Sequence, residues 1–418
     1  MARTPDRKNA DVLRILFVSD VSPSLGGVHG LRVRSVARGL ARLGHETAIL
    51  APAVPDVDWP LGDDLAERIA ARPAGEPALL TPLCEERGGP VPSRRSLATK
   101  LRTAHAFLVH GGVRPGWIRT GRRWGRPILD AFPADAVVAV FGDTSTLMIG
   151  RSVARAAGAP LVVDAKDNWQ NYVSPLVRTL MQRRLAEVAA LTSNAHLHLD
   201  AAAPHFSCPG TVVYSAGADT MRAAPSSTAD REHFTVMMVG STYRHDMLST
   251  FLAVLARWAG TKLAAERARI RYAYAGRSRA MVEACLARVG LPFPTIVRDN
   301  LSHEDLAALC QSAFVNAYIW LPLTFHYKLV ELISTRRPVL AFPGEHEESI
   351  AIAREMGGEL LMCQDEAALA EGFETLWQRW TSGNVRAVDL RPNPFTWDAA
   401  ARSFAQLLSR CVAERAGA

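Results

Sequence analysis

The segment from Phe314 to Glu345 constrains the fold of this chain more than any other. Its sequence, FVNAYIWLPLTFHYKLVELISTRRPVLAFPGE, predicts an apolar strand, a Pro-bounded loop, a short helix beginning near Thr324, and a second apolar strand led by Pro338. A strand–helix–strand unit of this kind belongs to a parallel sheet and places the helix N-terminus at the carboxyl edge of that sheet. Open α/β sheets bind ligands at this edge, so the segment predicts a binding site.

The predicted helix has a polar face opposite its apolar face. Tyr327, Lys328 and Glu331 are three or four residues apart, so they share one side of a helix. A helix N-terminus favours an anion such as phosphate, Lys328 adds positive charge, and Glu331 can accept two hydrogen bonds from ribose hydroxyls. This pattern indicates a site for a nucleotide sugar. On an ordinary exposed helix, the same two charged residues would simply form an ion pair.

Residues Lys328 to Ala341, K-L-x-E-x-x-x-x-x-R-P-V-L-A, resemble the donor-site signature of family 4 retaining glycosyltransferases, which have the GT-B fold. The resemblance implies that Glu331 binds the nucleotide ribose. Two positions depart from the family pattern. Leu323 replaces a glutamate that contacts the donor sugar in many relatives. Arg336 replaces a glycine that ends the helix in the left-handed conformation, so we expect a different turn there.

A second stretch, PLVVDAKDNW from Pro160 to Trp169, is similar to the family's P-L-V-x-x-x-R-D-x-W strand end. Lys166 takes the position of an arginine or histidine, and Asp167 matches the acidic residue. Side chains at the carboxyl end of a parallel strand face the ligand site, so both residues are expected to face the acceptor or the donor sugar. The alternative is that the two side chains neutralise each other in a loop.

Glycines and arginines after other predicted strands complete the candidate donor site; they are Gly26, Gly27, Gly240, Arg244, Gly276 and Arg277. Glycines let a backbone come close to a ligand, although a tight turn has the same requirement. The predicted site contains no Asp-x-Asp metal motif. We therefore expect side chains to neutralise the diphosphate, with no metal ion and no cofactor beyond the nucleotide sugar as co-substrate.

The segment from Arg94 to Arg126 is basic and contains no acidic residue. Trp117 and Trp124 are interleaved with its cations, and apolar residues between Leu97 and Leu108 keep helical spacing. A basic amphipathic segment with aromatic residues suits an anionic bilayer surface, where each cation contributes about 1 kcal/mol. The alternative is a solvated face whose apolar stripe packs on its own domain, and the sequence leaves both interpretations open.

Composition and charge exclude several classes of protein. With 48% apolar and 21% charged residues, the 418-residue chain is typical of a soluble globular protein of two to three domains. The net charge of +7 permits an anionic partner, but no nucleic-acid-binding module is recognisable. The cysteines lack CxxC spacing, no apolar run approaches the ~18 residues of a membrane span, and the N-terminus lacks a signal peptide's apolar segment. We expect a cytoplasmic protein that can attach to the inner face of the plasma membrane.

The order of predicted strands and helices indicates an α/β protein with two Rossmann-like domains and a cleft between them. Residues 1–219 are expected to form an N-terminal, acceptor-side domain, and residues 220–394 a C-terminal domain that binds the nucleotide-sugar donor. Residues 395–418 are expected to form a helix that packs back on the first domain. Residues 51–92, rich in Pro, Gly and acidic residues, are expected to be irregular. This arrangement is the GT-B fold that the resemblance implies.

The sequence therefore predicts a retaining glycosyltransferase. It would move a sugar from a nucleotide-diphosphate sugar to a sugar, lipid-linked or small-molecule acceptor, in cell-surface polysaccharide, glycolipid or secondary-metabolite synthesis. Such a reaction needs positive charge and backbone N–H groups aimed at the leaving diphosphate. One alternative is a GT-B scaffold that has lost activity and binds a glycan or a partner enzyme, which the departures at Leu323 and Arg336 favour. Another is a non-hydrolysing sugar-nucleotide epimerase.

Overall fold

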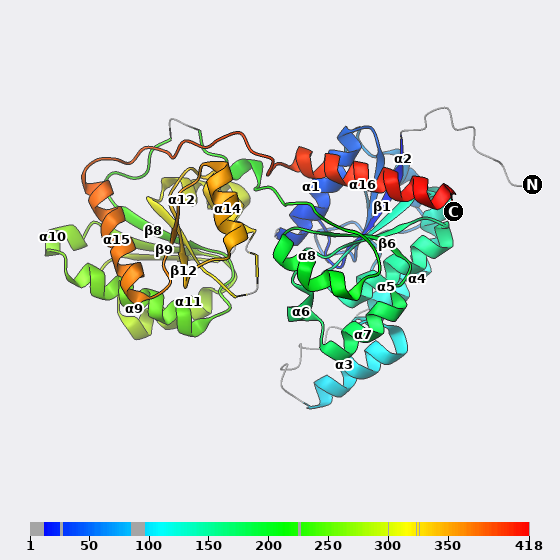
Figure 1. Cartoon of the computed structure of the whole chain (residues 1–418), viewed down its shortest axis with the longest axis horizontal. Helices are drawn as coiled ribbons and strands as arrows, with labels where there is room; N and C mark the ends of the chain where they lie inside the picture. Colours follow the sequence, from blue (N-terminus) through cyan, green and yellow to red (C-terminus); the bar gives the residue numbers. More distant parts are fainter. Residues whose placement is uncertain are drawn as a thin grey trace, which may run out of the picture. The chain divides into compact units, whose positions relative to one another are not determined.

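The structure is a computed structural model that describes residues 12–25, 28–84, 97–224, 227–299, 301–322, 324–325 and 327–417. Gly26, Gly27 and Leu323 lie outside the described residues, as do Arg94 and Arg95 of the basic segment. The chain forms two compact units, which are Met1–Ser215 with Trp397–Ala418 (unit 1) and Ala216–Thr396 (unit 2). Each unit contains one parallel sheet with helices on both faces (Figure 1).

The sheet of unit 1 has seven strands in the described part of the chain, in the order β3-β2-β1-β4-β5-β6-β7. The strands are β1 (Arg14–Val18), β2 (Glu46–Leu50), β3 (Ala78–Leu80), β4 (Ala136–Val140), β5 (Leu161–Asp164), β6 (Val188–Ser193) and β7 (Gly210–Val212). The chain adds strands in one direction from β1 and in the other from β4. The switch point therefore lies between β1 and β4, and in open α/β sheets ligands bind outside the carboxyl ends of such strands.

Two helical layers cover the unit 1 sheet. The helices are α1 (Val28–Arg42), α2 (Leu65–Ala70), α3 (Leu97–His110), α4 (Pro115–Ala131), α5 (Thr144–Ala157), α6 (Trp169–Tyr172), α7 (Pro175–Arg184), α8 (His196–Ala202), η1 (Ala203–His205) and α16 (Trp397–Gly417). Alternation along β1 sends Ile15 and Phe17 to the core beneath α1 and α16, and Leu16 and Val18 to the core beneath α4 and α5.

The C-terminal helix α16 packs along α1 at the other end of the unit 1 sequence (Figure 1). The approach is close because α1 has a glycine at the contact: a Cβ on Gly39 would lie 2.5 Å from the Cβ of Ala401. Phe404 of α16 meets Phe17 of β1 edge to face, with ring centroids 6.5 Å apart. Chain segments more than 350 residues apart thus complete one core.

The sheet of unit 2 has six parallel strands among the described residues, in the order β10-β9-β8-β11-β12-β13. They are β8 (Phe234–Val239), β9 (Ile270–Ala275), β10 (Thr295–Arg298), β11 (Val315–Ile319), β12 (Val339–Phe342) and β13 (Leu360–Met362). The helices are η2 (Asp219–Met221), α9 (His245–Gly260), α10 (Ala264–Arg267), α11 (Arg279–Val289), α12 (His303–Ser312), α13 (Lys328–Ser334), α14 (Glu347–Met356) and α15 (Glu366–Thr381). The switch point of this sheet lies between β8 and β11.

An aromatic cluster joins the unit 2 sheet to α9 and α15, which lie on the same side of it in Figure 1. The ring of Phe234 on β8 lies 5.9 Å from Trp258 of α9 and 5.5 Å from Trp377 of α15. All three side chains are buried. Aromatic pairs of this geometry contribute about 0.5–1.5 kcal/mol beyond their buried area, so the cluster fixes α9 and α15 against β8.

The prediction that residues 51–92 are irregular was wrong for part of this segment. It contains α2 and the edge strand β3, which pairs with β2. Both elements are too short to show a clear periodicity, yet Leu65 and Ile69 of α2 and Leu80 of β3 are buried in the unit 1 core. Residues 85–92 lie outside the described residues.

The basic segment contributes to α3 and α4, and its two tryptophans pack on the core of unit 1. Trp117 is fully buried and Trp124 packs against the same core. On α3, in contrast, Leu101 and Leu108 are each 62% exposed. The apolar surface of the segment is therefore on α3.

No helix within the described ranges combines the length and the hydropathy that crossing a membrane would need.

Candidate functional site

The helix α13, which carries the predicted donor motif, begins at Lys328 rather than near Thr324. The preceding residues form a turn: the Thr324 N–H donates to the Leu321 carbonyl oxygen at 3.2 Å, and the Trp320 indole donates to the Thr324 carbonyl oxygen at 3.3 Å. Pro322 lies within this turn, so the helix cannot begin earlier without rearranging it. Lys328 is thus the first helical residue, and Tyr327 is the residue before the helix.

The Lys328 amine crosses from α13 to the carboxyl end of β8. Its Nζ donates to the carbonyl oxygens of Val239 at 3.1 Å and Ser241 at 3.3 Å, on either side of Gly240. Burial lowers the pKa of Lys328 to about 8, against an opposing effect of Glu331 and Glu345. The amine is therefore mostly charged at pH 7. It places a positive charge at the unit 2 switch point, where the fold positions ligands.

Gly240 and Gly276 bring two neighbouring strand ends into direct contact beneath this amine. A Cβ on Gly276 would lie only 2.6 Å from the carbonyl oxygen of Gly240, and both residues have positive φ, +156° and +82°. The Tyr274 hydroxyl fixes the contact by donating to the Gly240 carbonyl oxygen at 2.8 Å. A side chain on Gly276 would push the two strand ends apart, and the left-handed backbone of Gly240 favours glycine. Lys328 Nζ lies 3.3 Å from a Cβ built on Gly240, so the structure brings these three predicted residues together.

Glu331 faces the segment from Ala216 to Ala218 in the same unit. The Ala218 N–H and the Tyr327 side chain hydrogen-bond its carboxylate, but burial outweighs them and raises the pKa of Glu331 to about 7. The Tyr327 hydroxyl has one proton, and the Ala216 carbonyl oxygen shares it with the Glu331 carboxylate. Lys328 and Glu331 form no ion pair with each other, so the interpretation as an ordinary exposed pair does not apply.

Sequence reasoning missed two residues beside Lys328. The Tyr318 hydroxyl on β11 donates to the carboxylate of Glu345, and Lys328 Nζ lies 5.9 Å from the centre of the Tyr318 ring. Burial raises the pKa of Glu345 to about 7. Its position three residues after β12, at the same sheet edge, was the signal available in the sequence.

The other predicted unit 2 residues are more exposed. Arg244, just before α9, donates from Nε to Asp246 Oδ1 at 2.9 Å and is 38% exposed. Arg277 is exposed after β9.

The turn after α13 corrects a second expectation. Arg336 adopts the left-handed conformation, with φ +60°, that the family pattern assigns to glycine. Its N–H donates to the Ile333 carbonyl oxygen at 2.9 Å, and its carbonyl oxygen accepts from the Val388 N–H at 2.8 Å. The turn is therefore of the usual type although a side chain is present, at a cost of about 1–2 kcal/mol.

In unit 1, Lys166 and Asp167 follow β5 and form an ion pair with each other. Lys166 is buried, whereas the Asp167 side chain is 37% exposed. This geometry is the mutual neutralisation that the sequence left open as an alternative.

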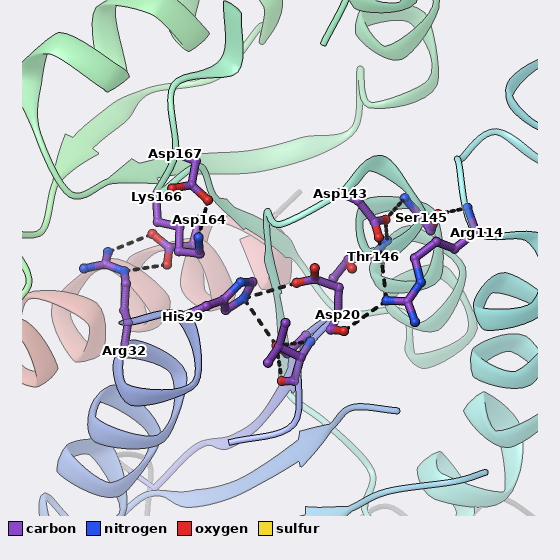
Figure 2. A network of polar contacts seen from close by, with 12 residues as sticks. Asp20, His29, Arg32, Arg114, Asp143, Ser145, Thr146, Asp164, Lys166 and Asp167 are labelled. Carbon is purple, nitrogen blue, oxygen red and sulfur yellow. Dashed lines mark hydrogen bonds and ion pairs between the residues drawn. The ribbon is translucent and has the colours of Figure 1, made fainter. Parts of the chain in front are cut away.

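A polar network around Asp20 and His29 was not predicted. Figure 2 shows Asp20 between His29 on one side and Arg114 with Asp143 on the other. His29 Nε2 lies 3.2 Å from Asp20 Oδ1, and Arg114 Nη1 donates to the Asp20 carbonyl oxygen at 3.0 Å. Burial, followed by the charge of Asp143, raises the pKa of Asp20 to about 7.

His29 is neutral at pH 7 because burial, followed by the charges of Lys166 and Arg32, lowers its pKa well below the usual value. Arg32 itself has a structural role. It donates two hydrogen bonds of 2.8 Å to Asp164, and both side chains are 2% exposed. This buried pair joins α1 to β5.

The order of strands and helices in both units is that of the GT-B fold. No protein-family model matches the chain, and no curated protein sequence matches it. Solved structures do match over nearly the whole length. Trehalose 6-phosphate synthase from Burkholderia multivorans is 14% identical, with a TM-score of 0.60 over 97% of this chain and 100% of that one.

HepE from Anabaena, solved in complex with UDP, is 13% identical and has a TM-score of 0.55 over 97% of this chain and 100% of that chain. A UDP-N-acetylglucosamine 2-epimerase is 12% identical, with a TM-score of 0.52 over 94% of each chain. At this level of identity the likeness establishes the fold, GT-B, and no more.

Proposed function

We propose that this protein is a retaining glycosyltransferase of the family 4 type, which uses a nucleotide-diphosphate sugar as donor. The observation that carries the proposal is the Lys328 amine held over Gly240 at the switch point of unit 2. This places a positive charge beside the glycine backbone at the end of β8, and stabilisation of the leaving group by fixed charge is usually a large contribution to transfer reactions. Among the matched structures, a trehalose 6-phosphate synthase and a UDP complex of HepE support the same class.

In this proposal, unit 2 binds the donor. Lys328 neutralises the diphosphate without a divalent metal, and Glu331 accepts hydrogen bonds from the ribose hydroxyls. The Ala218 N–H already occupies part of the Glu331 carboxylate, which leaves lone pairs for a diol. Unit 1 binds a sugar, lipid-linked or small-molecule acceptor. The product would be a cell-surface polysaccharide, a glycolipid or a secondary metabolite.

The second candidate is a non-hydrolysing sugar-nucleotide epimerase, which the match to a UDP-N-acetylglucosamine 2-epimerase supports. Both candidates bind a nucleotide in unit 2. They differ in the product formed from the donor alone. An epimerase converts the sugar of the donor into its epimer. A transferase releases the nucleotide slowly, and an acceptor accelerates this release. An inactive scaffold would do neither.

A thermal-shift screen with UDP-, GDP-, ADP- and dTDP-sugars tests the proposal. A ligand at 100 times its dissociation constant adds about 2.7 kcal/mol of stability, so a cognate donor raises the melting temperature clearly. We expect one nucleotide sugar to stabilise the wild type and to stabilise Lys328→Met less. Arg257→Met removes an exposed cation of α9 in the same unit and serves as the control. If no nucleotide sugar shifts the wild-type transition, the proposed function is wrong.

We also propose that the protein works in the cytoplasm, at the inner face of the plasma membrane, with α3 as the contact. Leu101 and Leu108 are exposed about two helical turns apart, and Arg119, Arg122 and Arg123 of α4 are exposed nearby in the sequence. Apolar side chains beside cations suit an anionic bilayer.

A further inference from the structure

The network of Figure 2 lies where unit 1 can hold a ligand. Asp20 follows β1 and Asp143 follows β4, on the two sides of the switch point, and Lys166 follows the next strand, β5. Ligands of open α/β sheets bind outside the strand ends at such a point. The charges in this network therefore decide which ligands are accepted.

Two of the cations in the network are already neutralised within unit 1. Arg32 makes a bidentate contact with Asp164, and Thr192 donates a further hydrogen bond of 2.9 Å to the same carboxylate. Lys166 is paired with Asp167. A phosphate or carboxylate of a ligand would have to displace one of these carboxylates to gain a cation.

The third cation, Arg114, contacts the Asp143 carboxylate and the backbone of Asp20. Its Nη1 lies 3.8 Å from Asp143 Oδ2 and donates to the backbone carbonyl oxygen of Asp20. The pKa of Asp143 is raised by burial, as that of Asp20 is, and each carboxyl group is only slightly exposed. The Asp20 carboxyl fills the space that a side chain on Gly142 would occupy, since a Cβ there would lie 2.1 Å from Asp20 Oδ1. A further anion at this point would face two crowded carboxyl groups, whereas an amine or a hydroxyl would relieve them.

Two hydroxyl groups at the start of α5 are a separate sign that the network is incomplete without a ligand. Thr144 Oγ1 and Thr146 Oγ1 are buried and have no hydrogen-bond partner among the described residues. In Figure 2 the Thr146 side chain points toward Asp20. Buried hydroxyls are usually satisfied, and these two could exchange hydrogen bonds with a polyhydroxyl ligand.

We propose that this network selects the acceptor, which carries hydroxyl groups, with or without an amine, and no phosphate or carboxylate at the end that enters unit 1. Asp20 accepts a hydrogen bond from an acceptor hydroxyl or amine, opposite the neutral His29. The inference rests on the proposed function, because it assigns unit 1 to the acceptor. It predicts an order of affinity in which an aminosugar binds most tightly, a neutral sugar follows, and a sugar phosphate binds least.

The test uses the full chain, saturated with UDP, and three probes that share one ring: glucosamine, glucose and glucose 6-phosphate. The imidazole NMR signal of His29, assigned as the signal that His29→Asn lacks, reports binding at pH 7. We expect glucosamine and glucose to shift this signal, with glucose 6-phosphate binding at least tenfold more weakly than glucosamine. Asp20→Asn should reduce the affinity for glucosamine to the affinity for glucose.

Asp167→Asn should increase the affinity for a phosphate-bearing probe, because it removes the carboxylate that pairs with the Lys166 amine. We expect glucose 6-phosphate to bind at least fivefold more tightly to this variant than to the wild type. Asp130→Asn is the matched control, because Asp130 is exposed on α4 and pairs with the exposed Arg126.

Glucose 6-phosphate binding as tightly as glucosamine would overturn the inference, and so would a His29 signal that none of the probes shifts. If Asp20→Asn does not fold, the order of the three probes on the wild type still decides. UDP binding, measured separately by calorimetry, tests the proposed function. A wild type that binds UDP but prefers the phosphate probe contradicts only the acceptor assignment.

Discussion

Burial changes the protonation of Lys328 and Glu331 in opposite directions. It lowers the pKa of Lys328 to about 8 and raises that of Glu331 to about 7. At pH 7 the lysine is therefore mostly charged, while the glutamate is near half ionisation. Affinity for a nucleotide sugar should then depend on pH through both residues, and a substitution can separate their effects.

Glu331→Gln should weaken donor binding more at pH 8 than at pH 6. The ionised carboxylate is the strong acceptor for ribose hydroxyls, contributing roughly 1.5–3 kcal/mol, and its population rises as the pH passes through about 7. At pH 6 the wild-type side chain is mostly protonated, so glutamine costs little. Calorimetric titration of both proteins at each pH measures the difference, and comparison at one pH cancels the contribution of Lys328. Equal losses at pH 6 and pH 8 would show that Glu331 does not bind the ribose as a carboxylate.

Arg336→Gly should stabilise unit 2 by about 1 kcal/mol. Arginine in the left-handed conformation costs more than glycine, and the Arg336 contact with Asp389, at 3.1 Å, is to a fully exposed carboxylate that contributes little. Urea denaturation measures the change in the free energy of unfolding. Arg336→Ala removes the same contacts but keeps a Cβ. The free energy of unfolding of the glycine variant should therefore exceed that of the alanine variant by about 1 kcal/mol. If the two variants are equally stable, the left-handed turn carries no strain.

At the scale of elements, the alternation of strands and helices was readable from the sequence because each buried parallel strand is a continuous apolar run. The predicted α/β class and GT-B fold were confirmed. The start of α13 was misplaced, because the Pro322 turn holds Thr324 outside the helix. The short elements α2 and β3 were missed for a different reason, since neither is long enough to show a period.

The candidate site was only partly predictable. Lys328, Gly240 and Gly276 could be proposed because each directly follows a strand or starts a helix at the carboxyl edge. The network of unit 1 could not, because its contacts join residues far apart in sequence. Arg32 meets Asp164 across 132 positions, and periodicity within an element carries no information on such pairs. An acidic residue shortly after a strand, such as Asp20 two residues after β1, was the available signal.

The helix α3 gives a prediction at the same scale. Leu101→Ser with Leu108→Ser should reduce binding to phosphatidylserine vesicles, because the two side chains are exposed and would lose about 1.5–3 kcal/mol each on leaving a membrane. Vesicle sedimentation measures this. Binding should also fall as salt rises, since attraction is screened over about 8 Å at 0.15 M ionic strength. Leu176→Ser, a change to an exposed leucine of α7, is the control. If the wild-type protein does not bind such vesicles at low salt, the basic segment is an ordinary domain surface.

At the scale of the whole molecule, the fold alone does not decide the reaction. The GT-B arrangement is shared by the matched trehalose 6-phosphate synthase and by the matched epimerase, at similar TM-scores of 0.60 and 0.52. What distinguishes such proteins is the chemistry at the strand ends of each unit. In this chain those ends carry a lysine amine in unit 2 and a carboxyl-rich network in unit 1.

That distribution of charge leads to a prediction on the reaction itself. We expect the product to keep the anomeric configuration of the donor and to form without a divalent metal. The Lys328 amine is held at the end of β8 by the two hydrogen bonds that it donates there. It can stabilise the negative charge that develops on the leaving diphosphate. The diphosphate can in turn accept the proton of the acceptor hydroxyl on the same face of the sugar. Lys328→Met should therefore lower kcat more than it raises KM, since the charge matters most in the transition state. NMR of the product reports its configuration, and kinetics with EDTA report the metal requirement. A product of inverted configuration would instead indicate a catalytic base in unit 1, and Asp20 and His29 would be the residues to test. Activity that EDTA abolishes and Mn²⁺ restores would show that Lys328 does not neutralise the diphosphate alone.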